Sequence, residues 1–155
     1  MIQMVGLPDG CVLRPAVQAD QKMIRRLVLS AFLDPTQLRW FQFWVIEASG
    51  QVVACGQLRA FPEAQELGSL VVAKDWRGRG LGRALTHHLI QQADRPLYLE
   101  CLGEQLTQFY SQMGFVPVDW RSLPPSLQRK FALSALAARW FRVPVRFMVY
   151  GGVGR

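Results

Sequence analysis

The chain has 155 residues, 50% of them hydrophobic, and a formal net charge of +7 at pH 7. This length and composition predict a single folded domain with its own core and exclude an intrinsically disordered protein. No stretch is long and apolar enough to predict a membrane span, and residues 1–10 lack the basic and apolar pattern of a signal peptide. The three cysteines, Cys11, Cys55 and Cys101, have no metal-ligand spacing, which predicts reduced cytoplasmic thiols rather than a disulfide framework.

The first part of the chain predicts one helix between a strand and a hairpin. Asp20 has the residue type of a helix N-cap, and Asp34-Pro35 is expected to end the same helix. Ser49-Gly50 separates two aromatic and β-branched runs and predicts a hairpin turn. The expected elements are a strand at 11–15, a helix at 21–32 and strands at 40–48 and 51–59.

The rest of the chain alternates short apolar runs with segments of helical periodicity. Gly114 is expected to follow the end of one helix, because glycine readily adopts the left-handed conformation found there. Hairpins come first and a strand–helix–strand unit follows, so the sequence predicts an α+β fold, a mixed sheet with helices on both faces. The expected elements are strands at 66–73, 97–102, 115–118 and 143–150, and helices at 81–93, 105–113 and 122–141.

The positive charge is concentrated at the C-terminal end of the chain. Residues 121–155 contain seven of the 18 basic residues and none of the 11 acidic ones. Apolar residues recur here at helical spacing, so we expect a basic C-terminal helix and strand that complete the sheet, not a solvated arm. The apolar helical face is expected to carry Leu127, Phe131, Ala135 and Ala138, and to be widened by Leu133, Leu136, Ala137 and Trp140.

The stretch from Leu70 to Leu85 predicts a strand, a glycine-rich loop and a helix in direct succession. A helix N-terminus presents backbone N–H groups and a favourable dipole to a phosphate, and glycines keep side chains off the ligand and permit positive φ. The spacing fits neither the P-loop, which ends in Gly-Lys-Ser/Thr, nor the Gly-x-Gly-x-x-Gly of dinucleotide-binding proteins. The expected cradle is Arg77, Gly78, Arg79, Gly80, Gly82 and Arg83.

The loop does fit the pattern Arg/Gln-x-x-Gly-x-Gly/Ala, as Arg77-Gly78-Arg79-Gly80-Leu81-Gly82, shortly after Leu70-Val71-Val72. This closely resembles the coenzyme A loop of the GNAT N-acetyltransferases. The run from Phe109 to Phe115 is similar to that family's Tyr-x-x-x-Gly-Phe helix end, with Tyr110 as the tyrosine. The predicted order of elements resembles the GNAT fold over nearly the whole chain, and the specific signals lie between residues 66 and 115.

The resemblance implies a single GNAT-like domain over residues 1–155, with a mostly antiparallel sheet of about six or seven strands. It implies acetyl-CoA as the co-substrate and no metal. Backbone amides around Val71 and Val72 are implied to face the thioester oxygen. The residues implied to bind acetyl-CoA are Leu70, Val71, Val72, Arg77, Gly78, Arg79, Gly80, Leu81, Gly82 and Arg83.

The chemistry implied by the resemblance is the attack of a neutral amine on the thioester. A lysine-type amine with a pKa of about 10.4 is almost fully protonated at neutral pH, so a carboxylate must accept its proton, directly or through a water. Glu66 is the first choice, since some histone-acetylating members place their catalytic glutamate eleven residues before the loop pattern; Glu100 is the alternative. Tyr110 lies where the family's tyrosine acid protonates the leaving thiolate. Otherwise Glu66 would be a sheet carboxylate paired with an arginine, and Tyr110 a core residue.

These observations predict an N-acetyltransferase that transfers acetyl from acetyl-CoA to a primary amine of a small, amino-acid-like molecule or of a protein or peptide. The basic tail would favour an acceptor that is anionic or zwitterionic away from its amine. A CoA-binding module without catalysis and a basic binder of nucleic acid or anionic surfaces are the alternatives. The leading prediction includes a cytoplasmic location, no membrane span and no nucleic-acid partner, and it is compatible with a homodimer.

Overall fold

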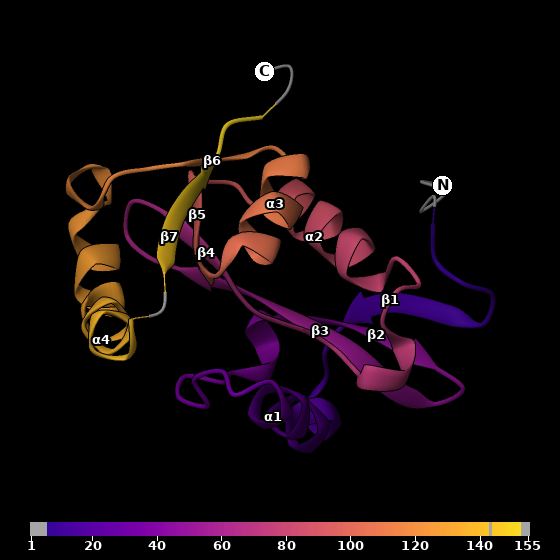
Figure 1. Ribbon diagram of the computed structural model, residues 1–155. Coiled ribbons are helices and arrows are strands. Elements are labelled where there is room, and N and C mark those ends of the chain that lie inside the picture. The colour runs from indigo at the N-terminus through magenta and orange to yellow at the C-terminus, as the bar shows by residue number, and fades with distance from the viewer. Residues whose placement is uncertain (1–5, 143, 153–155) are drawn as a thin grey trace. The chain divides into compact units, whose positions relative to one another are not determined.

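The computed structural model describes residues 6–142 and 144–152, without the side chains of Ala137, Ala138 and Phe141. Within these residues the chain forms seven strands and four α-helices (Figure 1). The strands are β1 Cys11–Pro15, β2 Phe43–Ala48, β3 Gln51–Ala60, β4 Gln65–Val72, β5 Leu97–Leu102, β6 Phe115–Pro117 and β7 Val145–Tyr150. The helices are α1 Gln21–Ser30, α2 Leu81–Gln92, α3 Glu104–Gln112 and α4 Pro125–Phe141.

The strands pair in the order β1-β2-β3-β4-β5-β7-β6. The pairs β1–β2, β2–β3, β5–β7 and β6–β7 are antiparallel, whereas β4 and β5 pair in parallel. The predicted α+β class with a mixed, mostly antiparallel sheet is therefore confirmed. The chain divides into two compact units: unit 1 is Met1–Leu58 with Leu67–Gln92, and unit 2 is Arg59–Glu66 with Ala93–Arg155. The single domain expected over residues 1–155 stays a prediction.

Unit 1 is built on β2 and β3, whose side chains alternate between two helix-covered faces. Val45 shares a buried cluster with Ile24 and Val28 of α1, and the next residue, Ile46, shares one with Leu85 of α2. Figure 1 shows the two helices on opposite sides of these strands. Each helix buries one face because its apolar residues recur every three or four positions.

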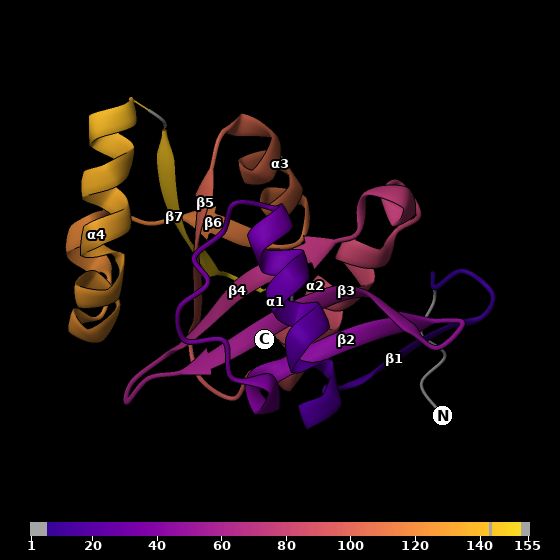
Figure 2. The ribbon, with the colours of Figure 1, turned by 90° about the horizontal axis from the view of Figure 1, so that it is seen from below.

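Unit 2 is built on β5, β7 and β6. Its ladder places Glu100 opposite Phe147 and Leu99 opposite Met148. Helix α4 covers one face, where the ring of Phe131 stacks on Phe147 with centroids 5.5 Å apart. Helix α3 lies on the other side of β5 and β7 (Figure 2).

Helix α1 ends earlier than the sequence predicted. Its last helical residue is Ser30, and Phe32 follows with a φ of 56°. The N–H of Leu33 donates to the carbonyl of Val28 at 3.2 Å. This hydrogen bond spans the left-handed Phe32 and ends the helix in a C-terminal capping motif. The expected stop at Asp34-Pro35 was therefore wrong, because the helix is ended by its own C-terminal motif before the proline acts.

Asp20 is the N-cap residue of α1, as predicted, but its side chain makes no capping hydrogen bond to that helix. Its backbone is already helical, and its carboxylate accepts hydrogen bonds from Nη1 of Arg14 at 2.7 Å and from the N–H of Val17 at 2.8 Å. The side chain therefore closes the short 3₁₀ turn that precedes α1 and ties it to β1. This pairing with Arg14 lowers the pKa of Asp20 despite its burial.

The basic tail forms the predicted helix and strand, α4 and β7, and β7 lies between β5 and β6. Leu127 and Phe131 are fully buried, as expected. The predicted widening of this face was wrong, because Leu133, Leu136 and Trp140 are 78%, 65% and 83% exposed. The side chains of Ala137 and Ala138, and Val143 where the strand was expected to begin, lie outside the described residues.

Two turns have the predicted conformation. Ser49 and Gly50 both have positive φ, 51° and 79°, which suits a tight hairpin, and Gly114 follows α3 with a φ of 102°.

Strand β2 begins at Phe43 because Trp40–Gln42 forms a 3₁₀ turn instead of extended chain. None of the helices formed by the described residues is long and apolar enough to cross a membrane.

Candidate functional site

In unit 1, the glycine-rich loop joins β4 to α2 after a short 3₁₀ turn, Lys74–Trp76. Gly78 and Gly80 have φ values of 77° and 84°, which a residue with a side chain rarely adopts. A Cβ at Gly78 would meet nothing within 4 Å, so the glycine serves the backbone conformation and leaves open space beside the loop. Gly82 lies within α2 and does not have a positive φ.

Two arginines of the loop donate hydrogen bonds to backbone carbonyls a few residues earlier in the chain. Nε of Arg77 donates to the carbonyl of Val72 at 3.1 Å, and Nη2 of Arg79 donates to the carbonyl of Asp75 at 3.1 Å. The Arg79 guanidinium also lies over the ring of Trp76, 4.5 Å from its centroid. Exposed guanidinium groups are thus held beside the glycines, where they add positive charge to an open backbone.

The start of α2 supplies the other part of the cradle. The N–H of Ala84 donates to the carbonyl of Gly80 at 3.0 Å, so the helical hydrogen bonds begin at Gly80. The first N–H groups of a helix have no carbonyl of their own helix to bind and favour an anion. Open glycines, nearby arginines and a helix N-terminus fit the phosphates of a CoA molecule.

Strand β4 carries an irregularity just before the loop. Ser69 has a φ of 51°, and its hydroxyl donates to Oε1 of Gln57 at 3.3 Å. The carbonyl of Ser69 accepts a hydrogen bond from the thiol of Cys55 at 3.5 Å. Burial raises the pKa of Cys55 to about 12, against a smaller opposing effect of the Val71 N–H, so this thiol is inert at neutral pH. Single-sequence reasoning missed this positive φ, since nothing in the residue type of Ser69 signals it.

In unit 2, Glu66 is a buried carboxylate held between two cations. Its Oε1 lies 2.9 Å from Nη1 of Arg59, and its Oε2 lies 2.8 Å from Nζ of Lys130. The Glu66 side chain is 3% exposed, and those of Arg59 and Lys130 are 7% and 17% exposed. Burial removes water that would otherwise screen these charges, so the three side chains depend on one another.

Glu100 lies in the same cluster but is less completely paired. Its Oε2 is buried and has no hydrogen-bond partner among the described residues. Burial raises the pKa of Glu100, and the negative charge of Glu66 adds to this effect. A hydrogen bond from Ser134 and the positive charges of Lys130 and Arg59 act in the opposite direction. A carboxyl group with a raised pKa and a bare oxygen is suited to accept a proton near neutral pH.

The register of β4 and β5 explains why the two glutamates meet. Glu66 pairs with Tyr98, and Glu100 follows Tyr98 by two residues, so all three side chains leave the same face of the strands. Lys130 and Ser134 are one helical turn apart on α4, which covers this face, and therefore reach both carboxylates. The alternative expected for Glu66, a sheet carboxylate paired with an arginine, is what the structure shows, and Arg59 is that arginine. The sequence analysis did not single out Arg59, although an arginine in the apolar run of β3 was a signal for a buried ion pair, and it missed Lys130.

Tyr110, the other predicted catalytic residue, lies on the opposite face. It is buried on α3 between Phe109 and Phe115, with ring centroids 5.1 and 5.7 Å away. Its hydroxyl makes no hydrogen bond to any residue that the structure describes. Burial, with a smaller effect of Cys101, raises the pKa of Tyr110 well above its usual value. Cys101 alternates with Glu100 along β5 and therefore faces the side of Tyr110, away from the glutamates.

The structure therefore brings Glu66 and Glu100 together and places Tyr110 across the sheet of unit 2 from them. The acetyl-CoA residues predicted from the sequence, from Leu70 to Arg83, lie in unit 1 on β4, the loop and the first turn of α2. The described residues contain no group of three or more His, Cys, Asp or Glu side chains that could hold a metal ion.

Known proteins with related sequences are acetyltransferases. A family model described as the acetyltransferase (GNAT) domain matches residues 39–117. An amino-acid acetyltransferase of Aliivibrio fischeri is 32% identical over 94 residues, 58% of this chain and 21% of that protein. One of Photobacterium profundum is 31% identical over 87 residues, 54% of this chain and 20% of that protein. The chain thus spans about a fifth of the length of these curated relatives.

Solved structures share the fold. N-acetylglutamate synthase from Neisseria gonorrhoeae, complexed with coenzyme A and N-acetyl-glutamate, has a TM-score of 0.75 at 18% identity, over 90% of this chain and 34% of that chain. Rv2747 from Mycobacterium tuberculosis, in complex with CoA and NLQ, has a TM-score of 0.73 at 20% identity, over 92% of this chain and 99% of that chain. The family model matches more than half of the 155 residues, and the chain belongs to the GNAT acetyltransferase family.

Proposed function

We propose that this protein is an acetyl-CoA-dependent N-acetyltransferase that acetylates the primary amine of an amino-acid-like molecule. The observation that carries the proposal is the loop from Arg77 to Gly82, whose two positive-φ glycines precede the N-terminus of α2 in a chain of the GNAT family. Acetyl-CoA would supply an activated acetyl thioester. The residues proposed to bind it are Leu70, Val71, Val72, Arg77, Gly78, Arg79, Gly80, Leu81, Gly82 and Arg83.

The amine of the acceptor must lose a proton, and we assign its uptake to the pair Glu66 and Glu100. Both oxygens of Glu66, the first choice from the sequence, are engaged by cations, whereas Oε2 of Glu100 has no partner among the described residues. This difference supports Glu100 as the group that receives the proton, with Glu66 setting its charge environment. Because the two carboxylates interact, their titration belongs to the pair.

Tyr110 is proposed to assist departure of the thiolate. A thiol has an ordinary pKa of about 8.5, well below the raised pKa of Tyr110, so complete proton transfer from the phenol would be uphill. A hydrogen bond donated by the hydroxyl to the developing negative charge has no such penalty. The hydroxyl makes no hydrogen bond to a described residue, so it is available for this role.

The acceptor class rests on the relatives. Those named above are amino-acid acetyltransferases, and one structural neighbour was solved with N-acetyl-glutamate. The basic tail supports an acceptor with a carboxylate away from its amine. Cys11, Cys55 and Cys101 are free thiols, which suits the cytoplasm, where we place the reaction.

The test is turnover of acetyl-CoA with a panel of amino acids, an acidic peptide and spermine, read as free CoA thiol and as acetylated product by mass spectrometry. Acetylation of amino acids, lost in the double variant Gly80→Ala with Tyr110→Phe, is the expected result. Binding of acetyl-CoA without turnover of any amine would identify a CoA-binding module instead. Absence of binding as well would overturn the assignment of the loop.

A further inference from the structure

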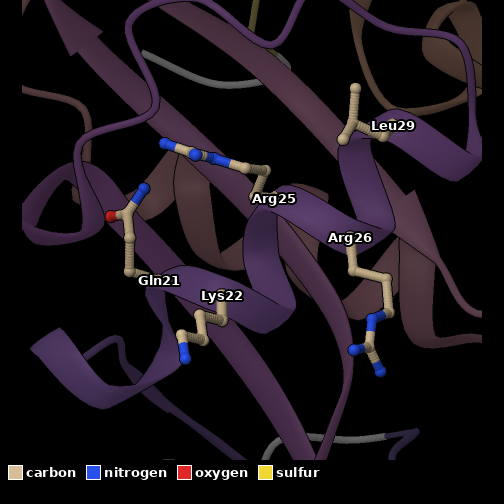
Figure 3. Close-up of a pocket in the computed structure, with 5 residues that line it drawn as sticks. All are labelled: Gln21, Lys22, Arg25, Arg26 and Leu29. Atoms are coloured by element: carbon tan, nitrogen blue, oxygen red, sulfur yellow. The ribbon is translucent and has the colours of Figure 1, made fainter.

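The outward face of α1 carries a basic hollow that the proposed reaction does not use. Lys22, Arg25, Arg26 and Leu29, with Gln21 at one end, line a surface hollow of about 470 Å³ in unit 1. In Figure 3, Lys22 and Arg26 leave the helix on one side and Arg25 on the other, with Leu29 farther along. The opposite face of α1, with Ile24, Leu27 and Val28, is buried in the core.

The three cations of this hollow are not neutralised by the protein. Among the described residues, Lys22, Arg25 and Arg26 have no hydrogen bond or ion pair, whereas Arg14 nearby in sequence binds two carboxylates. Lys22 lies four residues before Arg26 and leaves the helix on the same side, so these like charges face one another on adjacent turns and destabilise the helix slightly. An anion held between them would relieve this repulsion.

A second observation lies at the C-terminal end of the same face. Phe32 has a φ of 56° and a side chain that is 97% exposed. It occupies the left-handed position after α1, where glycine is favoured and a large side chain is strained. Leu29 is 51% exposed, three residues before it. A strained phenylalanine that contributes nothing to the core is a candidate contact for a partner.

We propose that Lys22, Arg25, Arg26, Leu29 and Phe32, the α1 surface, bind an acidic segment of another protein that carries an apolar side chain beside its acids. The acids would pair with the three cations in the hollow, and the apolar side chain would cover Leu29 and Phe32. This inference is independent of the acetyl-transfer reaction.

The charges and shape of the α1 surface favour this occupant over two others. None of the four α-helices formed by the described residues carries two acidic side chains, so a second copy has no helical face with matching acids. An anionic membrane would meet the cations, but a bilayer is flat at this scale, whereas a hollow accepts a projecting side chain or helix ridge. Vesicle binding is therefore an outcome of the test and not part of the proposal.

The probe is a fluorescent peptide of about twelve residues with Glu and Leu on one helical face, measured by anisotropy against the full chain. Its controls are the same peptide with Gln for Glu and with Ala for Leu. The test variant carries Arg25→Glu with Arg26→Glu, and the matched control, with the same change of net charge, carries Arg121→Glu with Arg139→Glu, two exposed arginines of the basic tail. Vesicles of phosphatidylserine with phosphatidylcholine form a separate arm.

We expect binding that weakens with added salt and falls at least about tenfold in the Arg25, Arg26 variant but not in the Arg121, Arg139 control. Phe32→Gly should weaken binding while raising the midpoint of thermal unfolding by about 2–4 °C, since it removes the backbone strain. A structural role for Phe32 would instead lower that midpoint. The proposal would be overturned if the Gln peptide bound equally well or if the variant with Arg25→Glu and Arg26→Glu kept its affinity for the peptide. It would also be overturned if the protein bound the vesicles but not the peptide.

Discussion

Nζ of Lys130 lies 2.8 Å from Oε2 of Glu66, and this ion pair joins helix α4 to strand β4 within unit 2. Nη1 of Arg59 holds the other oxygen of the same carboxylate at 2.9 Å. One of the seven charges of the basic tail is therefore neutralised inside the protein and is not available to a ligand. The contact also makes the environment of Glu100 depend on the position of α4.

Replacing Lys130 with Met should lower the free energy of unfolding by about 1–3 kcal/mol, because a buried carboxylate loses one of two hydrogen-bonded cations. Chemical denaturation at neutral pH measures this change. Arg139→Met is the matched control, since Arg139 is exposed and its loss should be nearly neutral. Equal stability of the two variants would mean that the pair contributes nothing.

Replacing Glu100 with Gln should remove a rising limb from the pH dependence of kcat/KM and lower the rate about 10²-fold. The base must be charged, and burial raises the pKa of Glu100, so activity should rise with pH through that value. Deprotonation of the acceptor amine produces a separate limb at higher pH, which should persist. If Glu66→Gln removed the lower limb and Glu100→Gln retained it, Glu66 and not Glu100 would be the base.

The same substitution has an effect on stability that is independent of catalysis. A folded-state pKa above the ordinary 4.5 means that folding disfavours the charged form of Glu100. The penalty is present above the folded pKa and disappears as the pH falls below the unfolded one. Glu100→Gln should therefore stabilise the protein at pH 8, and the gain should vanish near pH 4. A gain that is the same at both pH values would contradict the raised pKa.

Replacing Tyr110 with Phe should lower kcat about tenfold to hundredfold and leave the KM for acetyl-CoA nearly unchanged. The hydroxyl would act only as negative charge develops on the leaving sulfur. Because it makes no hydrogen bond to a described residue, thermal stability should not fall. A higher KM with unchanged kcat would show a contact made in the ground state instead.

Replacing Gly80 with Ala should weaken acetyl-CoA binding, because a Cβ would protrude where the backbone must approach a phosphate. Gly50→Ala is a matched control, since its φ of 79° is close to the 84° of Gly80 and both positions have space for a Cβ. Both variants should lose about 1–2 kcal/mol of stability from backbone strain.

Acetyl-CoA at a hundred times its dissociation constant adds about 2.7 kcal/mol of stability. Thermal unfolding with and without it should show this gain in Gly50→Ala and a reduced gain in Gly80→Ala. Equal gains in both variants would place the phosphates away from the loop.

Features set by neighbouring residues could be predicted from the sequence. The loop between Arg77 and Gly82 was identified because closely spaced glycines permit the positive φ that the loop requires and a helix begins directly after them. Helix α4 was predicted correctly as a helix, because apolar periodicity depends on residues three and four positions apart. Which of its apolar stripes would be buried could not be predicted. The ring of Phe147 on β7 selects Phe131, and Leu133 and Trp140 are left exposed.

Only the tertiary structure decided what surrounds the predicted base. Glu66 lies on β4 and Glu100 on β5, whereas Arg59 lies at the end of β3 and Lys130 on α4. No local rule links positions so far apart in the chain. The parallel register of Glu66 with Tyr98 places Glu100 on the same face. Electrostatic effects depend on distance and burial in space, so the raised pKa of Glu100 and the neutralised charge of Lys130 arise only after folding.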